Sequence, residues 1–398
     1  MKIVQINVVC NGSTGKIMCD LARKLNEKGH ESYIFFGRGN PKNDLNCKKI
    51  ENKFSIYFHG LLGRLGLNGH GSYFSTKRLI KELKKINPDV IHLHNIHGYY
   101  INLKVLFKYL KKEYKGKLIW TLHDCWAFTG HCSHFTIAKC QKWKTECKKC
   151  PNLKCYPKEL FDTTQKEFKL KKELFKNLNN LTIITPSNWL KELVEKSFLK
   201  EYSIKTINNS IDLKIFKPTY DEKIYEKYNI PKDKKIVLGV ANVWEEKKGI
   251  NDFIKLSQKI DSKKYQIVLV GTDERIEKKL PKRIISIRRT DNQEELAKIY
   301  SVSTVLFNPT YEDNYPTVNL EAQACGLPVL TYKTGGCPEQ VPANNIIDNN
   351  INNILKKIET KLEIKDLKKE KNEFIDKYLE VYEKWKYFFL QIYHHHIE

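Results

Sequence analysis

The chain of 398 residues is long enough for two domains that each bury a core. Its 70 Lys and Arg residues outnumber 46 Asp and Glu, which gives a net charge of +24. The charge is dispersed and no nucleic-acid-binding motif is present, which favours an anionic membrane surface or a phosphate-bearing ligand over nucleic acid; a lysine-rich composition without functional meaning is the alternative. No segment reaches the roughly 20 apolar residues that span a bilayer and no secretion signal is recognisable, which predicts a cytoplasmic protein, peripheral at most on the inner face of the membrane.

Short β-branched runs alternate with helical patterns along the chain, which is typical of parallel sheets covered by helices on both faces. The strand patterns lie at residues 2–9, 32–36, 89–94, 118–123 and 181–185, and then at 235–240, 266–270, 284–287, 304–308 and 329–332. A polar segment with Pro218 and Pro231 separates the two series. We therefore predict an α/β protein of two doubly wound, Rossmann-like domains facing a cleft, residues 1–208 and 209–375, with an aromatic-rich helix at about 376–398 packing back on the first domain.

The first strand pattern runs into a Gly/Ser/Thr loop and then a helical pattern. Gly12 and Gly15 in this loop permit unusual backbone angles and close approach, and the helix start can face a phosphate. The loop is neither a dinucleotide fingerprint nor a phosphate loop of the GxxxxGK[ST] type. It indicates either a ligand loop or a plain tight turn.

Polar residues follow the third and fourth strand patterns. His94, Asn95 and His97 end the third, and we expect them to line the acceptor side. His123 and Asp124 end the fourth, where the imidazole can donate a hydrogen bond to a substrate hydroxyl or move a proton and the carboxylate can orient it. The alternative is a set of structural histidines satisfied within the fold.

A cysteine cluster comes next, in a chain whose cytoplasmic setting argues against disulfides. Cys147 and Cys150 have the spacing of half a zinc site, and Cys132 and Cys140 can supply the other ligands. Four thiolates leave no open coordination position, so such a zinc ion would be structural. The first two spacings are longer than usual for a zinc knuckle, and free thiols are the alternative.

In the second half, Lys247 and Lys248 precede Gly249 and a helical pattern, directly after a strand. Ammonium groups at this point suit a diphosphate and would stabilise a departing one, although two solvated lysines give the same pattern. Arg289, in a later strand–loop–helix turn, can hold phosphate or remain in solvent.

The segment NPTYEDNYPTVNLEAQACGLPVLTYKTGGCPE, at residues 308–339, is the most informative. Asp313 lies in the loop at a strand's carboxyl end, and Glu321 lies about one turn inside the helix that begins near Thr317. Open α/β sheets bind ligands at such places, and the free N–H groups of a helix start add positive potential there. Carboxylates so placed can accept hydrogen bonds from sugar or ribose hydroxyls. The alternative makes Asp313 a turn former and Glu321 a solvated helix residue.

Taken together, these motifs, the stretches TPSNWL and NNSIDLKIFKP, and the region HDCWAFTGHC…CPNLKCYP resemble the retaining, two-domain glycosyltransferases of family 4, which have the GT-B fold. The cysteine region is similar to a subgroup that acts in bacterial capsule, O-antigen or exopolysaccharide assembly. The resemblance covers nearly the whole chain.

The resemblance implies roles for individual residues. The family's two glutamates, eight positions apart, correspond to Asp313, one methylene shorter, and Glu321, which would contact the donor sugar and the nucleotide ribose respectively. Lys248 matches the phosphate lysine, but Val243 stands where the family has an arginine, so Lys247 or Arg289 would take over part of the phosphate binding. The remaining matches are the glycine loop at Gly12, the cleft histidine His123, and the sugar-binding loop Asn314, Tyr315, Pro316 and Thr317.

These observations predict a metal-independent hexosyltransferase that needs no cofactor for its chemistry. It would move a sugar, with retention of configuration, from a nucleotide-diphosphate sugar to a saccharide acceptor in surface polysaccharide biosynthesis, and we expect this acceptor to be lipid-linked. His123, Asp124, Lys248 and Asp313 would be its catalytic residues. Two rival functions are a nucleotide-sugar epimerase of the same fold and a non-catalytic protein that binds a polyanion or a membrane.

Overall fold

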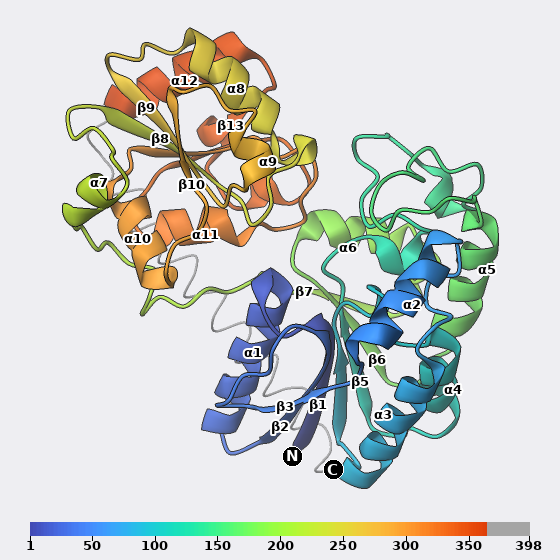
Figure 1. Cartoon of the computed structure of the whole chain (residues 1–398). Coiled ribbons are helices and arrows are strands. Elements are labelled where there is room, and N and C mark those ends of the chain that lie inside the picture. The colour runs from blue at the N-terminus through green and yellow to red at the C-terminus, as the bar shows by residue number, and fades with distance from the viewer. Residues whose placement is uncertain (364–398) are drawn as a thin grey trace. The chain divides into compact units, whose positions relative to one another are not determined.

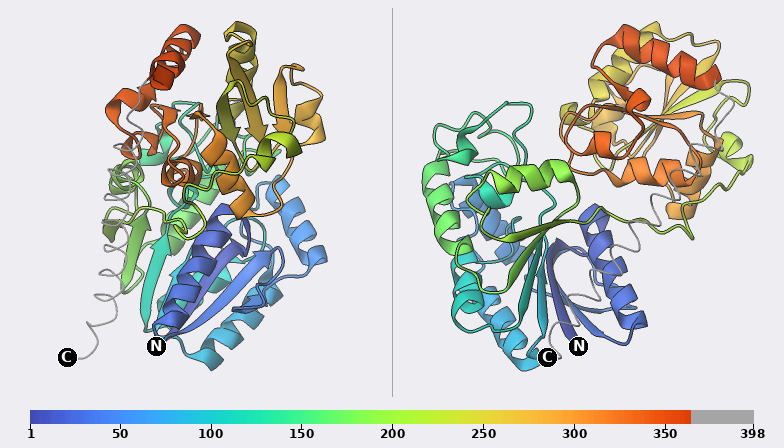
Figure 2. Two further views of the ribbon diagram at one scale, coloured as in Figure 1. Left: turned by 90° about the vertical axis from the view of Figure 1, so that its left-hand side faces the viewer. Right: turned by 180° about the vertical axis from the view of Figure 1, so that it is seen from behind.

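The computed structural model describes residues 1–363, and the chain divides into two compact units, Met1–Thr206 and a second that begins at Ile207 (Figure 1). Each unit is a parallel β-sheet with helices packed on both faces (Figures 1 and 2). The predicted helix at about 376–398 lies outside the described residues. Among residues 1–363 no helix has the length and apolar character needed to cross a bilayer.

The sheet of the first unit has seven strands in the order β3-β2-β1-β4-β5-β6-β7, and all neighbours are parallel. The strands are β1 Lys2–Val9, β2 Glu31–Arg38, β3 Asn46–Lys49, β4 Val90–Leu93, β5 Lys117–Thr121, β6 Leu181–Thr185 and β7 Ser203–Thr206. The α-helices are α1 Gly12–Glu27, α2 Lys53–Arg64, α3 Tyr73–Ile86, α4 Leu103–Lys112, α5 Thr164–Phe175 and α6 Asn188–Glu195, and the 3₁₀ helices are η1 Trp126–Phe128 and η2 Lys142–Lys144.

The sheet of the second unit has six parallel strands in the order β10-β9-β8-β11-β12-β13. The strands are β8 Lys235–Val240, β9 Tyr265–Val270, β10 Ile284–Ile287, β11 Val305–Asn308, β12 Val329–Tyr332 and β13 Ile346–Ile347. The α-helices are α7 Lys223–Lys227, α8 Ile250–Lys259, α9 Glu274–Glu277, α10 Gln293–Val302, α11 Thr317–Ala324 and α12 Ile351–Glu363. Three 3₁₀ helices, η3 Glu246–Lys248, η4 Cys337–Glu339 and η5 Ala343–Asn345, complete the unit.

The two doubly wound α/β domains predicted from the sequence are confirmed, and all ten predicted strands are present. The inner strands were recognisable because they are buried on both faces and read as continuous apolar runs. Three strands escaped prediction, β3, β7 and β13, and each lies at the edge of its sheet. An edge strand is short and polar, as the sequences NCKK of β3 and SIKT of β7 show.

The strand order defines one special place in each sheet. Strand order reverses between β1 and β4 in the first unit and between β8 and β11 in the second, so successive helices leave to opposite faces there. Doubly wound sheets bind ligands outside the carboxyl ends of the strands at this switch point. The loops that follow β1, β4, β8 and β11 are therefore where a ligand is expected to bind.

Candidate active site

In the second unit, Lys248 and Asp313 meet at the switch point. Lys248 ends η3, which follows β8, and Asp313 lies in the loop after β11. The Lys248 ammonium lies 2.5 Å from the Asp313 carboxylate, and both side chains remain partly exposed. Burial lowers the pKa of Lys248, but the Asp313 carboxylate outweighs this and leaves the pKa above its ordinary value. Lys248 therefore stays protonated, as one half of an ion pair, at the place where such sheets bind ligands.

Backbone contacts hold the two loops together. The carbonyl of Lys247 accepts hydrogen bonds from the backbone N–H of Tyr311, at 2.8 Å, and from the hydroxyl of Thr310, at 3.3 Å. Gly249 follows with φ of +76°, and a Cβ built on it would lie 2.3 Å from the carbonyl oxygen of Pro309. Only glycine permits this backbone angle and this close approach. Gly249 therefore helps to fix the position of the preceding residue, Lys248.

Helix α11 carries Glu321, which is buried. The hydroxyl of Tyr300, on α10, donates to its carboxylate at 3.1 Å. The start of the helix is held by amides: Asn319 accepts from Asn308 and donates to Gln340, each at 2.9 Å, and Gln340 donates to the carbonyl of Pro316 at 3.0 Å. The two predicted carboxylates thus have different partners, Lys248 for Asp313 and Tyr300 for Glu321.

The rest of the predicted sugar-binding loop, Asn314, Tyr315, Pro316 and Thr317, leads into the start of α11. The carbonyl of Tyr315 accepts a hydrogen bond from Asn209 at 2.9 Å, which fixes the loop's backbone. The N-cap of α11 is Pro316, whose side chain has no group that could accept a hydrogen bond from the start of the helix. Backbone N–H groups at such a start are available to an anionic or hydroxylic ligand.

The other predicted phosphate ligands lie less centrally. The ammonium of Lys247 pairs with exposed Glu245 at 3.1 Å rather than with Asp313. Arg289 is exposed and follows β10, the edge strand of the sheet, two strands from β8. The structure therefore brings Lys248 and Asp313 together and leaves Lys247 and Arg289 outside this pair.

In the first unit, a row of polar side chains runs from β1 to the residues that follow β4 and β5. Gln5 faces His94, at 3.2 Å, and His94 faces His123, at 3.1 Å. Next to this row, His92 hydrogen-bonds to Thr121 at 2.8 Å and stacks on His94. The row ends at His123, two residues beyond the end of β5, whereas the sequence predicted that the strand itself would extend to this residue.

The row determines which nitrogen of each ring carries the proton. The amide nitrogen of Gln5 donates to the Met18 carbonyl at 3.3 Å, so its oxygen faces His94 and can only accept. His94 therefore donates from Nε2 and accepts at Nδ1 from Nε2 of His123. Burial lowers the pKa of His123 to about 4 and holds that of His94 well below its ordinary value, so both rings are neutral at pH 7. Nδ1 of neutral His123 then carries no proton, so this nitrogen can accept a hydrogen bond but cannot be the donor considered from the sequence.

Asp124 does not orient His123 through a hydrogen bond of its own but pairs with His97. Nε2 of His97 lies 2.9 Å from one carboxylate oxygen, and the backbone N–H of Trp126 donates to the other at 2.9 Å. Burial would raise the pKa of Asp124, but His97 and these hydrogen bonds hold it at about 2. Asn95 is placed beside β1, because its backbone N–H donates to Asn7 at 3.2 Å.

The glycine loop after β1 lies at the switch point of the first unit. Gly12 opens α1 with φ of +69°, and a Cβ on Gly15 would lie 2.7 Å from the carbonyl carbon of Cys10. Gly15 thus allows α1 to pack closely on the end of β1. The two glycines have different uses, one in the turn and one in helix–strand packing.

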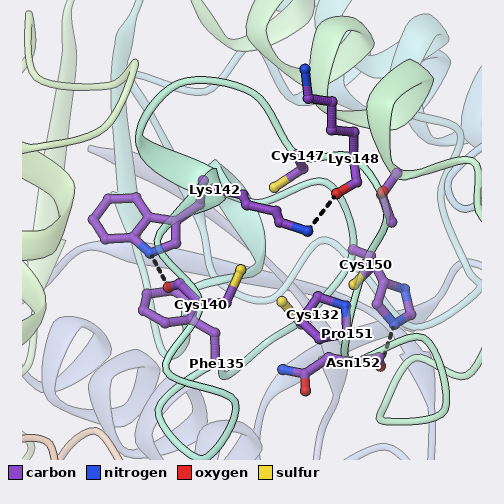
Figure 3. A pocket seen from close by; sticks show the side chains of 12 residues that line it. Cys132, Phe135, Cys140, Lys142, Cys147, Lys148, Cys150, Pro151 and Asn152 are labelled. Atoms are coloured by element: carbon purple, nitrogen blue, oxygen red, sulfur yellow. Dashed lines mark hydrogen bonds between the residues drawn. The ribbon is translucent and has the colours of Figure 1, made fainter.

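The four cysteines of the predicted zinc site, Cys132, Cys140, Cys147 and Cys150, line one small pocket in the loop between η1 and α5 (Figure 3). As they stand, no three thiol, imidazole or carboxylate groups among residues 1–363 are arranged to ligate a single ion. The pocket is a separate feature from the switch-point loops.

Gln5, Asn7 and Tyr300 are polar residues of the candidate site that sequence reasoning missed. Gln5 and Asn7 interrupt the apolar run IVQINVV, although an inner strand of a parallel sheet is normally apolar throughout. Both are fully buried. Two polar residues at alternate positions of such a strand are the signal that could have revealed the row. Tyr300 gave no comparable signal, because its partner Glu321 is apparent only in the fold.

Family profiles cover nearly the whole chain. Residues 14–215 match Glycosyltransferase Family 4, and residues 221–378 match Glycosyl transferases group 1. The chain belongs to glycosyltransferase family 4. One relative of this family 4 glycosyltransferase is the putative colanic acid biosynthesis glycosyl transferase WcaC of Escherichia coli K12, with 29% identity over 231 residues, 54% of this chain and 55% of WcaC. The matched region thus spans about half the length of that relative.

Solved structures show the same fold for this family 4 chain. Sucrose-phosphate synthase from Thermosynechococcus elongatus has a TM-score of 0.71 at 18% identity, covering 98% of this chain and 99% of that chain. The Anabaena protein HepE, in complex with UDP and glucose, has a TM-score of 0.63 at 14% identity, covering 93% of this chain and 92% of that chain. The GT-B fold class predicted from the sequence is confirmed.

Proposed function

We propose that this chain is a retaining glycosyltransferase that moves a hexose from a nucleotide-diphosphate sugar to a lipid-linked saccharide during surface polysaccharide biosynthesis. The observation that carries the proposal is the pair formed by Lys248 and Asp313 at the switch point of the second unit. The name of WcaC supports the polysaccharide, and the complex of HepE with UDP and glucose supports the donor class.

In this proposal Lys248 neutralises the diphosphate, and its charge is most useful as the sugar–phosphate bond breaks and the leaving group becomes more negative. The start of α11, where Pro316 supplies no side-chain cap, adds positive potential, so the chain's own groups replace a divalent metal. Asp313, released from part of its contact with Lys248 by the incoming phosphate, accepts hydrogen bonds from the sugar hydroxyls.

Glu321, already held by Tyr300, receives the ribose hydroxyls. For retention, the acceptor hydroxyl attacks on the face from which the diphosphate departs, and the departing phosphate oxygen takes its proton. His123, with Nδ1 as acceptor, binds a hydroxyl of the donor or the acceptor. This assignment uses the proton positions set by Gln5 and His94.

The test is transfer from a panel of UDP-, GDP- and ADP-sugars to lipid-linked saccharide, read by mass of the product and by nuclear magnetic resonance of the new linkage. Lys248→Met should lower kcat by about 100- to 1,000-fold, the effect of removing one preorganised charge-stabilising group. The control is Lys264→Met. Lys264 is exposed, pairs with Asp261, and lies just before the amino end of β9, whereas the site lies beyond the carboxyl ends of the strands. Unchanged turnover in Lys248→Met contradicts the proposal. Epimer formed from donor alone, without acceptor, favours an epimerase instead.

A surface of the first unit supports the lipid-linked acceptor and a position at the membrane. Helix α2 buries small and polar residues and exposes its large apolar ones. On its buried side, His59 bonds to Ser72 at 2.8 Å and Gly63 packs on Tyr99, while the large apolar side chains face solvent. These side chains recur at helical spacing and are exposed by 52–81%: Phe54, Tyr57, Phe58 and Leu61.

The charges beside this helix face favour an anionic lipid surface as its partner. Lys53 and Arg64 are exposed at the two ends of α2, and Lys77 and Arg78 are exposed on the neighbouring α3. Exposed Phe74 and Leu160 extend the apolar surface, and the backbone of Leu160 bonds to the carbonyl of Arg64. Aromatic side chains bordered by basic ones are typical of helices that lie in a membrane interface.

Flotation with vesicles of phosphatidylcholine, with and without phosphatidylglycerol, tests this surface. The protein should bind the anionic vesicles, weakly at high salt, and Phe54→Ser with Phe58→Ser should abolish binding without changing the thermal midpoint. Tyr220→Ser, at an exposed aromatic residue of the second unit, is the control. If the double variant binds like the wild type, α2 is not the contact. Binding of vesicles by a protein that transfers no sugar favours the non-catalytic alternative.

A further inference from the structure

We propose that the pocket lined by Cys132, Cys140, Cys147 and Cys150 binds one structural Zn²⁺ through four thiolates. The sequence alone left zinc and free thiols as equal alternatives. The fold adds that cysteines separated by up to 18 positions converge on one pocket (Figure 3). The proposal does not depend on the glycosyltransferase activity, because the pocket is separate from the switch-point loops.

The size of the pocket suits a single ion. Its free space is about 10 Å³, close to that of one water molecule. In this structure the thiols are not at the mutual distances of a tetrahedral site. The side chain of Lys142 extends between them, and its ammonium bonds to the carbonyls of Lys148 and Lys149 at 3.0 and 2.7 Å (Figure 3). Metal binding requires that the thiols turn inward and that Lys142 move aside. Both are side-chain rotations, with no rearrangement of strands or helices.

The surroundings suit a negatively charged centre. Zn²⁺ bound by four thiolates carries two net negative charges, and Lys142 and Lys148 line the pocket. The backbone N–H of Gly130 donates to the sulfur of Cys147 at 3.2 Å, an interaction that stabilises charge on a thiolate. Beneath the loop, buried Lys171 bonds to the carbonyls of Trp126 and Thr129 at 2.9 and 3.0 Å. The Lys148 ammonium is exposed and pairs with Glu146 at 3.7 Å, so the positive surroundings of the thiols consist of Lys142, Lys171 and the Gly130 N–H.

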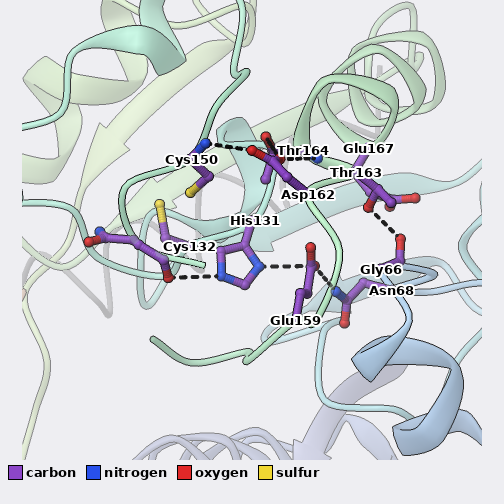
Figure 4. Close-up of polar contacts among 12 residues, drawn as sticks. Gly66, Asn68, His131, Cys132, Cys150, Glu159, Asp162, Thr163, Thr164 and Glu167 are labelled. Carbon is purple, nitrogen blue, oxygen red and sulfur yellow. Dashed lines mark hydrogen bonds and ion pairs between the residues drawn. The ribbon is translucent and has the colours of Figure 1, made fainter. Parts of the chain in front are cut away.

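The loop also has a structural need for a cross-link. Between Thr129 and Thr163 the only helix or strand among the described residues is η2, of three residues. Its ends are tied by polar contacts: the N–H of Cys150 donates to Asp162 at 2.7 Å, Asp162 accepts from Thr164 at 2.6 Å, and His131 pairs with Glu159 at 2.9 Å (Figure 4). Within the loop, Asn152 donates to the carbonyl of His134 at 3.2 Å, and Lys142 bonds to the carbonyls of Lys148 and Lys149. A metal would add a cross-link between the four segments that carry the cysteines.

The chemistry balances without an oxidant. Four thiols and one Zn²⁺ give a tetrathiolate complex of charge −2 and four released protons. All four positions are filled by protein, so the ion holds the loop and takes no part in sugar transfer. Tetrahedral sulfur ligation also suits iron, which the experiment must separate from zinc.

Elemental analysis of the full chain, purified without chelator, tests the proposal. We expect one zinc per chain, and a loss of at least 80% of it in Cys147→Ser and in Cys140→Ser. Cys155→Ser, which removes a nearby exposed cysteine that does not line the pocket, should retain the full amount. Absence of zinc in the wild type, or iron in its place, overturns the proposal. So does equal zinc in all three variants.

Cobalt exchange provides a second readout that does not depend on how well a variant folds. Wild-type protein stripped of metal and reloaded with Co²⁺ should show thiolate-to-cobalt absorption in the near ultraviolet and intense visible bands of a tetrahedral site. Its thermal midpoint should rise on metal addition. Weak octahedral bands, or a thiol titration under denaturing conditions that finds fewer than the chain's 11 cysteines because disulfides have formed, contradict a tetrathiolate centre.

Discussion

Glu321 is a buried carboxylate that accepts a hydrogen bond from the hydroxyl of Tyr300 at 3.1 Å. If it also receives ribose hydroxyls, Glu321→Ala should weaken nucleotide binding by roughly 1.5–3 kcal/mol, the value of a hydrogen bond to a charged group. Titration calorimetry with the preferred nucleoside diphosphate measures this. Tyr300→Phe is the matched variant, because it removes only the group that positions the carboxylate and should cost less than tenfold in affinity. Equal losses in both variants would show that Glu321 serves the packing of α10 on α11 rather than the nucleotide.

Variants of His123 test whether its tautomer, which the contacts with His94 and Gln5 assign, determines how it binds the substrate. Because Gln5 and His94 leave Nδ1 as an acceptor, His123→Phe should lower kcat/KM by about 3- to 10-fold, the value of one hydrogen bond. His123→Asn should retain more activity, since its amide oxygen can accept from nearly the same place. The wild-type rate should also show no ionisation near pH 6.5, because burial lowers the pKa of His123 to about 4. A rate that depends on a group titrating near pH 6.5 and loses that dependence in His123→Asn would contradict the assignment.

The connection from β8 to α8 shows how an element positions a catalytic group. Gly249→Ala would place a methyl group 2.3 Å from the Pro309 carbonyl oxygen and strain a φ of +76°. We expect the second unit to lose about 3 kcal/mol or more of its free energy of unfolding, from the clash and the left-handed backbone together. Gly29→Ala is a control with the same backbone cost, about 1–2 kcal/mol, since it has φ of +79° and its Cβ would have no neighbour within 4 Å. Urea denaturation compares the two, and equal losses would mean that the Pro309 contact is easily relieved.

The strands and helices show which parts of the fold can be predicted from the sequence. Inner strands and the helices between them follow from apolar periodicity, and the positions of Lys248 and Asp313 follow from strand–loop–helix order, so their convergence was predictable in outline. Edge strands such as β3 and β7 were missed because their lysines and polar residues are compatible with solvent. The pairings of Gln5 with His94 and of Asp124 with His97 depend on which strands become neighbours and on side-chain direction, which periodicity does not specify.

Among residues 1–363, the histidines are unevenly distributed between the two units. All nine histidines among residues 1–363 lie in the first unit. Burial lowers the pKa of His59 and His123 to about 4 and that of His92 to about 3, so these rings are neutral in the folded state. The second unit, in the described residues, has no such group.

Acid should therefore unfold the first unit before the second. Because the folded-state pKa values lie below the unfolded value of 6.5, the stability from the neutral rings is complete above pH 6.5 and is lost as pH falls toward 4. At pH 5 each of these histidines lowers the free energy of unfolding by about 2 kcal/mol. Asp124, whose pKa is about 2, loses its contribution only below about pH 4, in a separate and lower window. Hydrogen exchange resolved by peptide should show protection falling between pH 7.5 and 5 in residues 1–206 while that of residues 207–363 persists, whereas a parallel loss in both would mean that the two units unfold as one.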